Sequence, residues 1–141
     1  MMSINERQDE LIEEFSMFDD WMEKYEYIID LGKDVKGIPE DIKSEDYLVR
    51  GCQSRVWLIP AQENGILQFQ ADSDAIITKG IVGMVVRVLN NSSADEILKS
   101  DLYFVDKIGL KEHLSPTRSN GLVSMIKKIK TYALAYSAKA I

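Results

Sequence analysis

Apolar residues recur every three or four positions through residues 5–32, with acidic residues between them. This spacing predicts two amphipathic helices. The Asp19-Asp20 pair offers a cap for the second helix, and Gly32 is expected to end it in a left-handed conformation. The apolar positions are Leu11, Ile12, Phe15, Phe18, Trp21, Met22, Tyr25, Ile28 and Ile29. Residues of this kind at this spacing indicate helix faces packed into a core.

The next part of the chain changes from helical spacing to strand signals. Residues 33–47 keep no period and predict a connection with one short helical turn. Residues 55–59 and 66–71 are predicted strands, and the Asn64-Gly65 pair between them is typical of a two-residue hairpin. Pro60 suits the end or the edge of a strand, because it has no amide hydrogen to donate. A small antiparallel sheet is therefore expected.

A nearly continuous apolar stretch then predicts a central, deeply buried helix over residues 74–90. Asp72 or Ser73 is its expected cap. Gly80 and Gly83 weaken a helix intrinsically, so their presence indicates close approach of another backbone.

Three further helices follow in the pattern. Ser93 and Glu96 have capping-box spacing at the start of a short helix, and a second one is expected over residues 102–108. Ser115-Pro116 then begins the last helix, with Ser as its cap and Pro in its first turn. Its expected buried side carries Leu122, Met125, Ile126, Ile129 and Leu134. A sequence of helices, then a hairpin, then helices predicts an α+β fold.

Composition limits the class of protein. With 141 residues, of which 45% are hydrophobic, the chain is expected to form a single domain over residues 1–141. One cysteine forms no internal disulfide, and residues 1–6 do not resemble a secretory signal, so a cytoplasmic location is expected. The apolar stretch of residues 76–89 is too short to cross a membrane. A net charge of -6 argues against nucleic acid as a partner, and the lysines of residues 127–130 suit a solvated helix face.

Cys52, the only cysteine, lies in the run Arg50-Gly51-Cys52-Gln53-Ser54-Arg55, just before the first predicted strand. Positive neighbours and partial exposure lower the pKa of a thiol and favour the nucleophilic thiolate. A lone cysteine can instead be buried as a small apolar side chain. The residues alone leave both interpretations open.

The inventory of other reactive groups narrows the chemistry. Cys52 and His113 are the only cysteine and histidine, and they lack the paired spacing of a structural zinc site. With Asp72 or Asp74 they supply the residue types of a cysteine-dependent hydrolase. The alternative for His113 is a polar residue near a helix junction. A thiol with no second thiol to attack a persulfide suits sulfur carriage better than dithiol redox chemistry.

Four blocks of sequence stand out. They are Trp21 with Tyr25–Gly32, Val49–Ser54 leading to Val56-Trp57, Ala71–Ala75, and His113–Leu122. In this order the blocks resemble the SufE family of sulfur acceptors, which includes CsdE-like proteins. They span nearly the whole chain, and their combination is specific where any single block is not.

The resemblance implies a fold similar to SufE and to the iron–sulfur scaffold protein IscU, with helices on one side of a small antiparallel sheet. It also implies that Cys52 takes persulfide sulfur from a SufS-type cysteine desulfurase, stimulates that enzyme, and passes sulfur to a SufBCD-type scaffold complex for iron–sulfur cluster assembly. The chain is then a sulfur-transfer protein rather than an enzyme. It needs no cofactor or metal of its own, because the pyridoxal phosphate belongs to the desulfurase. The family further suggests a loop tip that shelters the sulfur and turns outward on docking; self-association stays open.

Five residues are candidates to support Cys52. Backbone amides from Gly51 to Gln53 are expected to stabilise its anion, with Gly51 leaving room for close approach. Arg118 is the candidate cation, with a surface ion pair or a cap as its alternative. Asp74 is expected to cap the central helix, and His113 to shape the surroundings of the loop.

Overall fold

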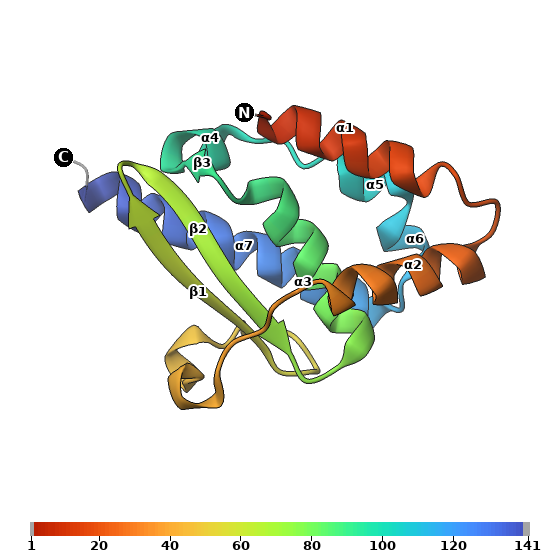
Figure 1. Ribbon diagram of the computed structural model, residues 1–141, viewed down its shortest axis with the longest axis horizontal. Helices are drawn as coiled ribbons and strands as arrows, with labels where there is room; N and C mark the ends of the chain where they lie inside the picture. Colours follow the sequence, from red (N-terminus) through yellow and green to blue (C-terminus); the bar gives the residue numbers. More distant parts are fainter. Residues whose placement is uncertain (1, 140–141) are drawn as a thin grey trace.

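The computed structural model describes residues 2–139, and its elements follow the predicted order of helices, a hairpin and further helices (Figure 1). The helices are α1 (Ile4–Phe15), α2 (Trp21–Lys33), α3 (Ile76–Leu89), α4 (Ala94–Lys99), α5 (Phe104–Ile108), α6 (Leu110–His113) and α7 (Pro116–Lys139). Two short 3₁₀ helices, η1 (Glu40–Ile42) and η2 (Glu45–Tyr47), lie in the connection where one turn was expected. The α+β class is confirmed.

The sheet is antiparallel, with strands β1 (Val56–Glu63), β2 (Ile66–Ser73) and β3 (Ser92–Ser93) in the order β1-β2-β3. Both strands of the hairpin extend beyond their predicted ends. Asn64 and Gly65 form its turn with φ values of 52° and 79°, which confirms the hairpin prediction. Pro60 lies inside β1 on the edge of the sheet, opposite Phe69, as its missing donor requires.

Helix α3 occupies the centre of the molecule, as predicted, and packs against both α2 and the sheet. Gly80 is what brings α2 close: a Cβ at Gly80 would lie 2.7 Å from Cγ2 of Ile28. Gly32 faces it from α2, where a Cβ would lie 2.8 Å from the backbone nitrogen of Gly80. The expectation that Gly32 ends α2 in a left-handed conformation is wrong, because α2 continues to Lys33 and Gly32 serves as a contact point between helices.

Helix α7 crosses behind the hairpin and closes the core from the other side of α3 (Figure 1). Its Leu122, Met125 and Ile129 are buried, and the hydroxyl of Tyr132 donates to the carbonyl of Leu58 in β1 at 3.1 Å. The prediction for Leu134 is wrong: its side chain is 62% exposed. Ala133, the residue before it, is fully buried, so Leu134 lies on the side of α7 that is turned away from the core.

The helix caps were predicted with mixed success. Asp20 accepts a hydrogen bond from the Glu23 amide at 2.9 Å, and Ser93 and Glu96 form the expected capping box. Helix α3, by contrast, begins two residues later than predicted and has no side-chain cap, so neither Asp72 nor Ser73 caps it. Instead, the Ser73 hydroxyl bonds to the loop that carries Cys52, and the Asp72 carboxylate bonds to the connection between α2 and β1. The short helix α6, after Gly109, was not predicted.

Candidate functional site

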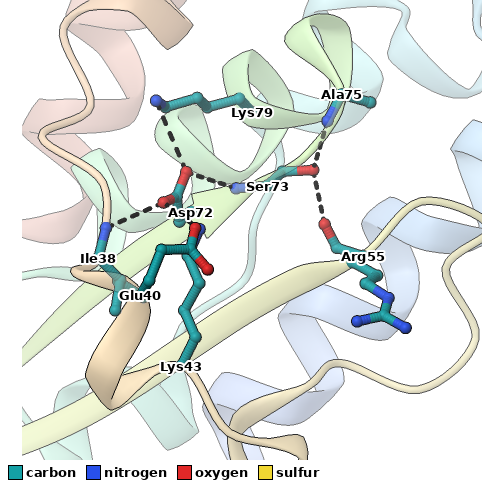
Figure 2. Close-up of polar contacts among 8 residues, drawn as sticks. All are labelled: Ile38, Glu40, Lys43, Arg55, Asp72, Ser73, Ala75 and Lys79. Atoms are coloured by element: carbon teal, nitrogen blue, oxygen red, sulfur yellow. Dashed lines mark hydrogen bonds and ion pairs between the residues drawn. The ribbon is translucent and has the colours of Figure 1, made fainter.

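The loop that carries Cys52 is closed at its base by backbone hydrogen bonds. The Val49 amide donates to the carbonyl of Val56 at 2.8 Å, at the start of β1. Arg55 is held on both sides, since its carbonyl accepts from the Ser73 hydroxyl at 2.8 Å and its amide donates to the Asp74 carboxylate at 3.1 Å. Figure 2 shows Ser73 reaching from the end of β2 to Arg55 and to the amide of Ala75. Residues 50–54 lie beyond this base and form the tip of the loop.

These bonds correct the role expected for Asp74. Its carboxylate binds the Arg55 amide across the loop and does not cap α3. Ser73 is equally important at this point, although only a capping role was expected for it. Together the two side chains fix where the loop returns to the sheet.

The tip of the loop rests on α7. The Cys52 thiol donates to the carbonyl of Gly121 across 3.6 Å, and a Cβ at Gly121 would lie 3.4 Å from the sulfur. Gly51 has a φ of +95°, and a Cβ there would lie 2.5 Å from the Ser124 hydroxyl oxygen. Two glycines therefore permit the contact, one in the loop and one in the helix.

The thiol faces a small cavity of about 90 Å³ between the loop, α3 and α7. Apolar walls come from Ile77, Ile81 and Met125, while Gln53 and Arg118 line its polar side. The structure thus brings together Cys52, Gln53 and Arg118 from the predicted set. The apolar residues of the cavity wall were not predicted as site residues, because the sequence pattern indicates only that they are buried.

Burial raises the pKa of the Cys52 thiol. Of the two interpretations that the sequence leaves open, the structure shows a half-buried thiol rather than one presented between two cations. Arg50 and Arg55 are exposed, and no described interaction joins either side chain to the sulfur. A half-buried thiol without a paired cation stays protonated and is a poor nucleophile.

Arg118 lines the cavity, but its guanidinium is bound by a residue outside the cavity. Its guanidinium lies 5.6 Å from the ring centre of Tyr25 and donates to the hydroxyl of that residue. Tyr25 belongs to α2, so the contact joins α2 to the first turn of α7. Arg118 is placed at the rim of the site without forming an ion pair with the thiol.

His113 lies apart from the cysteine cavity. Its ring stacks on Trp21 with centroids 4.1 Å apart, and its Nδ1 is 3.0 Å from the carbonyl oxygen of Gly109. Asp72 is also engaged elsewhere. The structure therefore does not assemble the hydrolase arrangement of Cys52 and His113 with Asp72 or Asp74, and the contacts of His113 fit a residue at a helix junction.

Asp72 organises the segment that leads into the loop (Figure 2). Its carboxylate accepts from the Ile38 amide at 2.9 Å and forms ion pairs with Lys43 at 3.1 Å and Lys79 at 3.6 Å. Burial alone would raise the pKa of Asp72, but bonds from Ile38, Lys43 and the Ser73 amide outweigh it and hold the pKa below its usual value. The ionised carboxylate of Asp72 thus links the connection between α2 and β1 to strand β2 and helix α3.

Replacing Asp72 with Asn is expected to destabilise the protein by about 3 kcal/mol at neutral pH, because two partly buried lysines and a buried amide lose the charge of a buried partner. The lowered pKa means that this stabilisation is present above the ordinary carboxyl pKa and is lost as the pH falls through the folded value. Urea unfolding of the wild type and Asp72→Asn should therefore differ most at neutral pH and converge in acid.

Asp74→Asn is the matched control for that measurement. Asp74 is exposed, and among the described residues its carboxylate accepts a hydrogen bond only from Arg55, so its loss should cost about 1 kcal/mol or less. Equal effects of the two substitutions would contradict the assignment of Asp72 as the organising carboxylate.

Metal sites and membrane spans are not found in the part of the chain that the structure describes. Within residues 2–139, no three His, Cys, Asp or Glu side chains cluster in a way that could hold a metal ion. Among the helices described, none is long and apolar enough to cross a membrane.

The sequence matches a known protein family over most of its length. Residues 9–133 match the family described as "SufE: Fe-S metabolism associated domain". An uncharacterized SufE-like protein of Rhizobium meliloti (strain 1021) is 41% identical over 130 residues, covering 89% of this chain and 93% of that protein. A second from Rhizobium etli is 40% identical over 135 residues, covering 92% of this chain and 91% of that protein.

The fold has a counterpart among solved structures. The solution structure of a hypothetical protein from Thermus thermophilus matches with a TM-score of 0.74 over 92% of this chain and 94% of that one, at 18% identity. That likeness concerns the fold alone. The family match over most of the chain and the identity to its members confirm the resemblance seen in the four sequence blocks: the chain belongs to the SufE family, which is associated with iron–sulfur metabolism.

Proposed function

We propose that the protein accepts persulfide sulfur on Cys52 from a pyridoxal-phosphate cysteine desulfurase of SufS type, stimulates that enzyme, and delivers the sulfur to a SufBCD-type scaffold for iron–sulfur cluster assembly. One observation carries the proposal: the only thiol of the chain lies at the tip of a tethered loop and faces a small cavity of its own. Pyridoxal phosphate remains in the donor, and this chain contributes the accepting thiol.

The transfer is a thiol exchange. The Cys52 thiol gives its proton to solvent, and the thiolate attacks the outer sulfur of the donor's cysteine persulfide. A new sulfur–sulfur bond forms at Cys52 as the bond to the donor cysteine breaks, and the donor cysteine leaves as a thiolate. No oxidant or reductant is consumed, because the transferred sulfur brings its own oxidation state.

The resting position of Cys52 suits storage better than attack. Burial favours the protonated thiol, whereas attack requires the thiolate and room for the partner's sulfur. Within residues 2–139, a single weak hydrogen bond of 3.6 Å, from the Cys52 thiol to Gly121, joins the tip to α7, while several hydrogen bonds hold the base. We therefore infer that the tip leaves α7 for each transfer while the base stays closed, with Gly51 supplying the flexible backbone.

The cavity supports storage of the product. Its volume of about 90 Å³ exceeds the roughly 30 Å³ that a water molecule occupies in the liquid, so one added sulfur atom fits beside the thiol. Walls from Ile77, Ile81 and Met125 would limit the access of water to a persulfide between partners. Amides of Gly51 and Gln53 remain candidates for stabilising the anion once the tip has moved.

Cys52→Ser tests whether acceptance at this residue causes the stimulation. The variant keeps nearly the same shape, so it is expected to bind a SufS-type desulfurase, yet to leave sulfide release from cysteine at the rate of the desulfurase alone. Turnover with wild type or variant is measured beside a binding titration of each. If the serine variant stimulated turnover as well as the wild type, direct transfer to Cys52 would be the wrong mechanism.

A further inference from the structure

A second cavity, of about 510 Å³, lies along α3 and shares no lining residue with the cysteine cavity. Its walls are mainly apolar and come from three elements. They are Leu31 and Val35 at the end of α2 and just after it, Phe69 and Ala71 in β2, and Met84 and Val86 in α3. Its size falls within the range of known ligand sites, which are roughly 300–1,000 Å³.

The free edge of β2 borders this cavity. β3 pairs with β2 only at Ile66 and Leu67. At Phe69 the side chain of Asn90 replaces a strand: its Oδ1 accepts from the Phe69 amide at 2.8 Å, and its Nδ2 donates to the Phe69 carbonyl at 3.5 Å. The backbone groups of Phe69 therefore point away from β1.

Ala71 is the next residue whose backbone faces this edge. Residues two apart in a strand direct their amide and carbonyl to the same side, and the register with β1 is regular through this region. Further along the edge, the Ser73 amide donates to the carboxylate of Asp72 at 2.8 Å. On both sides of Ala71, an amide at this edge is thus bonded to a side chain: that of Phe69 to Asn90 and that of Ser73 to Asp72.

The backbone of Ala71 has no such partner on this side. Among residues 2–139 no interaction is described for its outward amide or carbonyl, although the residue is only 5% exposed. More than nine in ten buried backbone groups in proteins are paired, so the free amide and carbonyl of this largely buried residue are available to a partner from outside the chain. They lie at the wall of an apolar cavity.

We propose that this cavity binds an extended peptide segment of a partner protein. A residue of that segment pairs its carbonyl and amide with the amide and carbonyl of Ala71, as strands do when they add to a sheet edge. The apolar side chain of the same residue lies on the face of Ala71 and enters the space between Val35, Phe69 and Met84. Backbone pairing gives the peptide its direction, and the cavity selects an apolar side chain. The site is independent of Cys52, and nothing in the proposal requires sulfur transfer.

A titration of the ¹⁵N-labelled protein with the blocked peptide acetyl-Val-Leu-Val-amide tests the proposal. The expected result is a saturable shift of the Ala71 amide signal, with smaller shifts along the edge of β2 and at Met84. The same peptide methylated on its leucine nitrogen should bind about tenfold more weakly, since it cannot donate to the Ala71 carbonyl. A silent Ala71 signal up to the solubility of the peptide, or equal binding of both peptides, would overturn the proposal.

Two further measurements distinguish a site that binds peptide backbone from one that binds any apolar group. N-isobutylacetamide carries one amide and the leucine-like group, and binding as tight as that of the peptide would make the occupant a small molecule and reject the proposal. Val35→Phe fills the cavity from its rim and should abolish the shifts. Val123→Phe, at a 46% exposed position on α7 outside the cavity, is the matched control and should bind like the wild type.

Discussion

Replacing Gly51 with Ala is expected to release the Cys52 thiol from its cavity and to speed its alkylation about tenfold. A Cβ at this position would lie 2.5 Å from the Ser124 hydroxyl oxygen and 3.4 Å from its Cβ, so either this hydroxyl or the loop tip must move, and both movements weaken the docked state. Each 1.4 kcal/mol that the overlap takes from the docked state multiplies the exposed population by about ten. The rate of Cys52 alkylation by iodoacetamide at neutral pH measures this.

Gly65→Ala is the matched control, because Gly65 has a similar φ of +79° but no atom within 4 Å of its Cβ position. Both substitutions carry the backbone strain of about 1–2 kcal/mol, and only the one at Gly51 also meets a neighbour. Adding Ser124→Gly to Gly51→Ala removes the hydroxyl and should restore slow alkylation. If Gly51→Ala reacted no faster than Gly65→Ala, the tip would not be held by its contact with α7.

The second large effect is expected at the crossing of α2 and α3. Gly80→Ala should destabilise the protein by about 3 kcal/mol, since its Cβ would meet the Ile28 carbonyl carbon at 2.8 Å and Ile28 Cγ2 at 2.7 Å. Backbone on the opposing helix cannot rotate away as a side chain can. The two helices would have to separate, which loosens the packing of the whole core. Urea unfolding followed by circular dichroism measures the change in the free energy of unfolding.

Gly83→Ala supplies the comparison within the same helix. Its Cβ would lie 2.8 Å from Cγ2 of Val35, a half-buried side chain with room to move, and 3.8 Å from the Leu31 carbonyl oxygen. The gain of about 1 kcal/mol in helix propensity should offset much of this contact, leaving stability within about 1 kcal/mol of the wild type. A Gly80→Ala protein as stable as Gly83→Ala would contradict the close crossing.

Features that local chemistry determines were predictable from the sequence. Asn64-Gly65 forms the hairpin because both residues adopt positive φ at little cost. Ser93 and Glu96 begin α4 because each satisfies the amide of the other. The close approach at Gly80 was also predictable, because a glycine inside an apolar helix indicates a close neighbour. Such rules need only residues close in sequence.

Features that depend on distant partners were predicted less well. Gly32 has the residue type of a helix end, but its contact with Gly80 lets α2 continue past it. Asp74 has the position of a cap, but the loop offers the amide of Arg55 as a partner. In both cases tertiary structure supplied an alternative that the local pattern does not contain.

The environment of Cys52 illustrates the same limit at the candidate site. The two arginines near it in sequence are exposed, whereas the contact that buries the thiol comes from Gly121, 69 positions away. Gly121 appeared in the family-like block 113–122 but was given no role. The reasoning applied to Gly80 would have flagged it, because it too is a glycine inside a predicted helix.

The central claim is that Cys52 carries the transferred sulfur, and mass spectrometry tests it most directly. The protein is mixed with a SufS-type cysteine desulfurase and free cysteine, then analysed intact and as peptides. The account predicts the mass of one or more added sulfur atoms on the wild type, located on the peptide that contains Cys52, and no added mass on Cys52→Ser. An unmodified wild-type protein beside a demonstrably active desulfurase would contradict it.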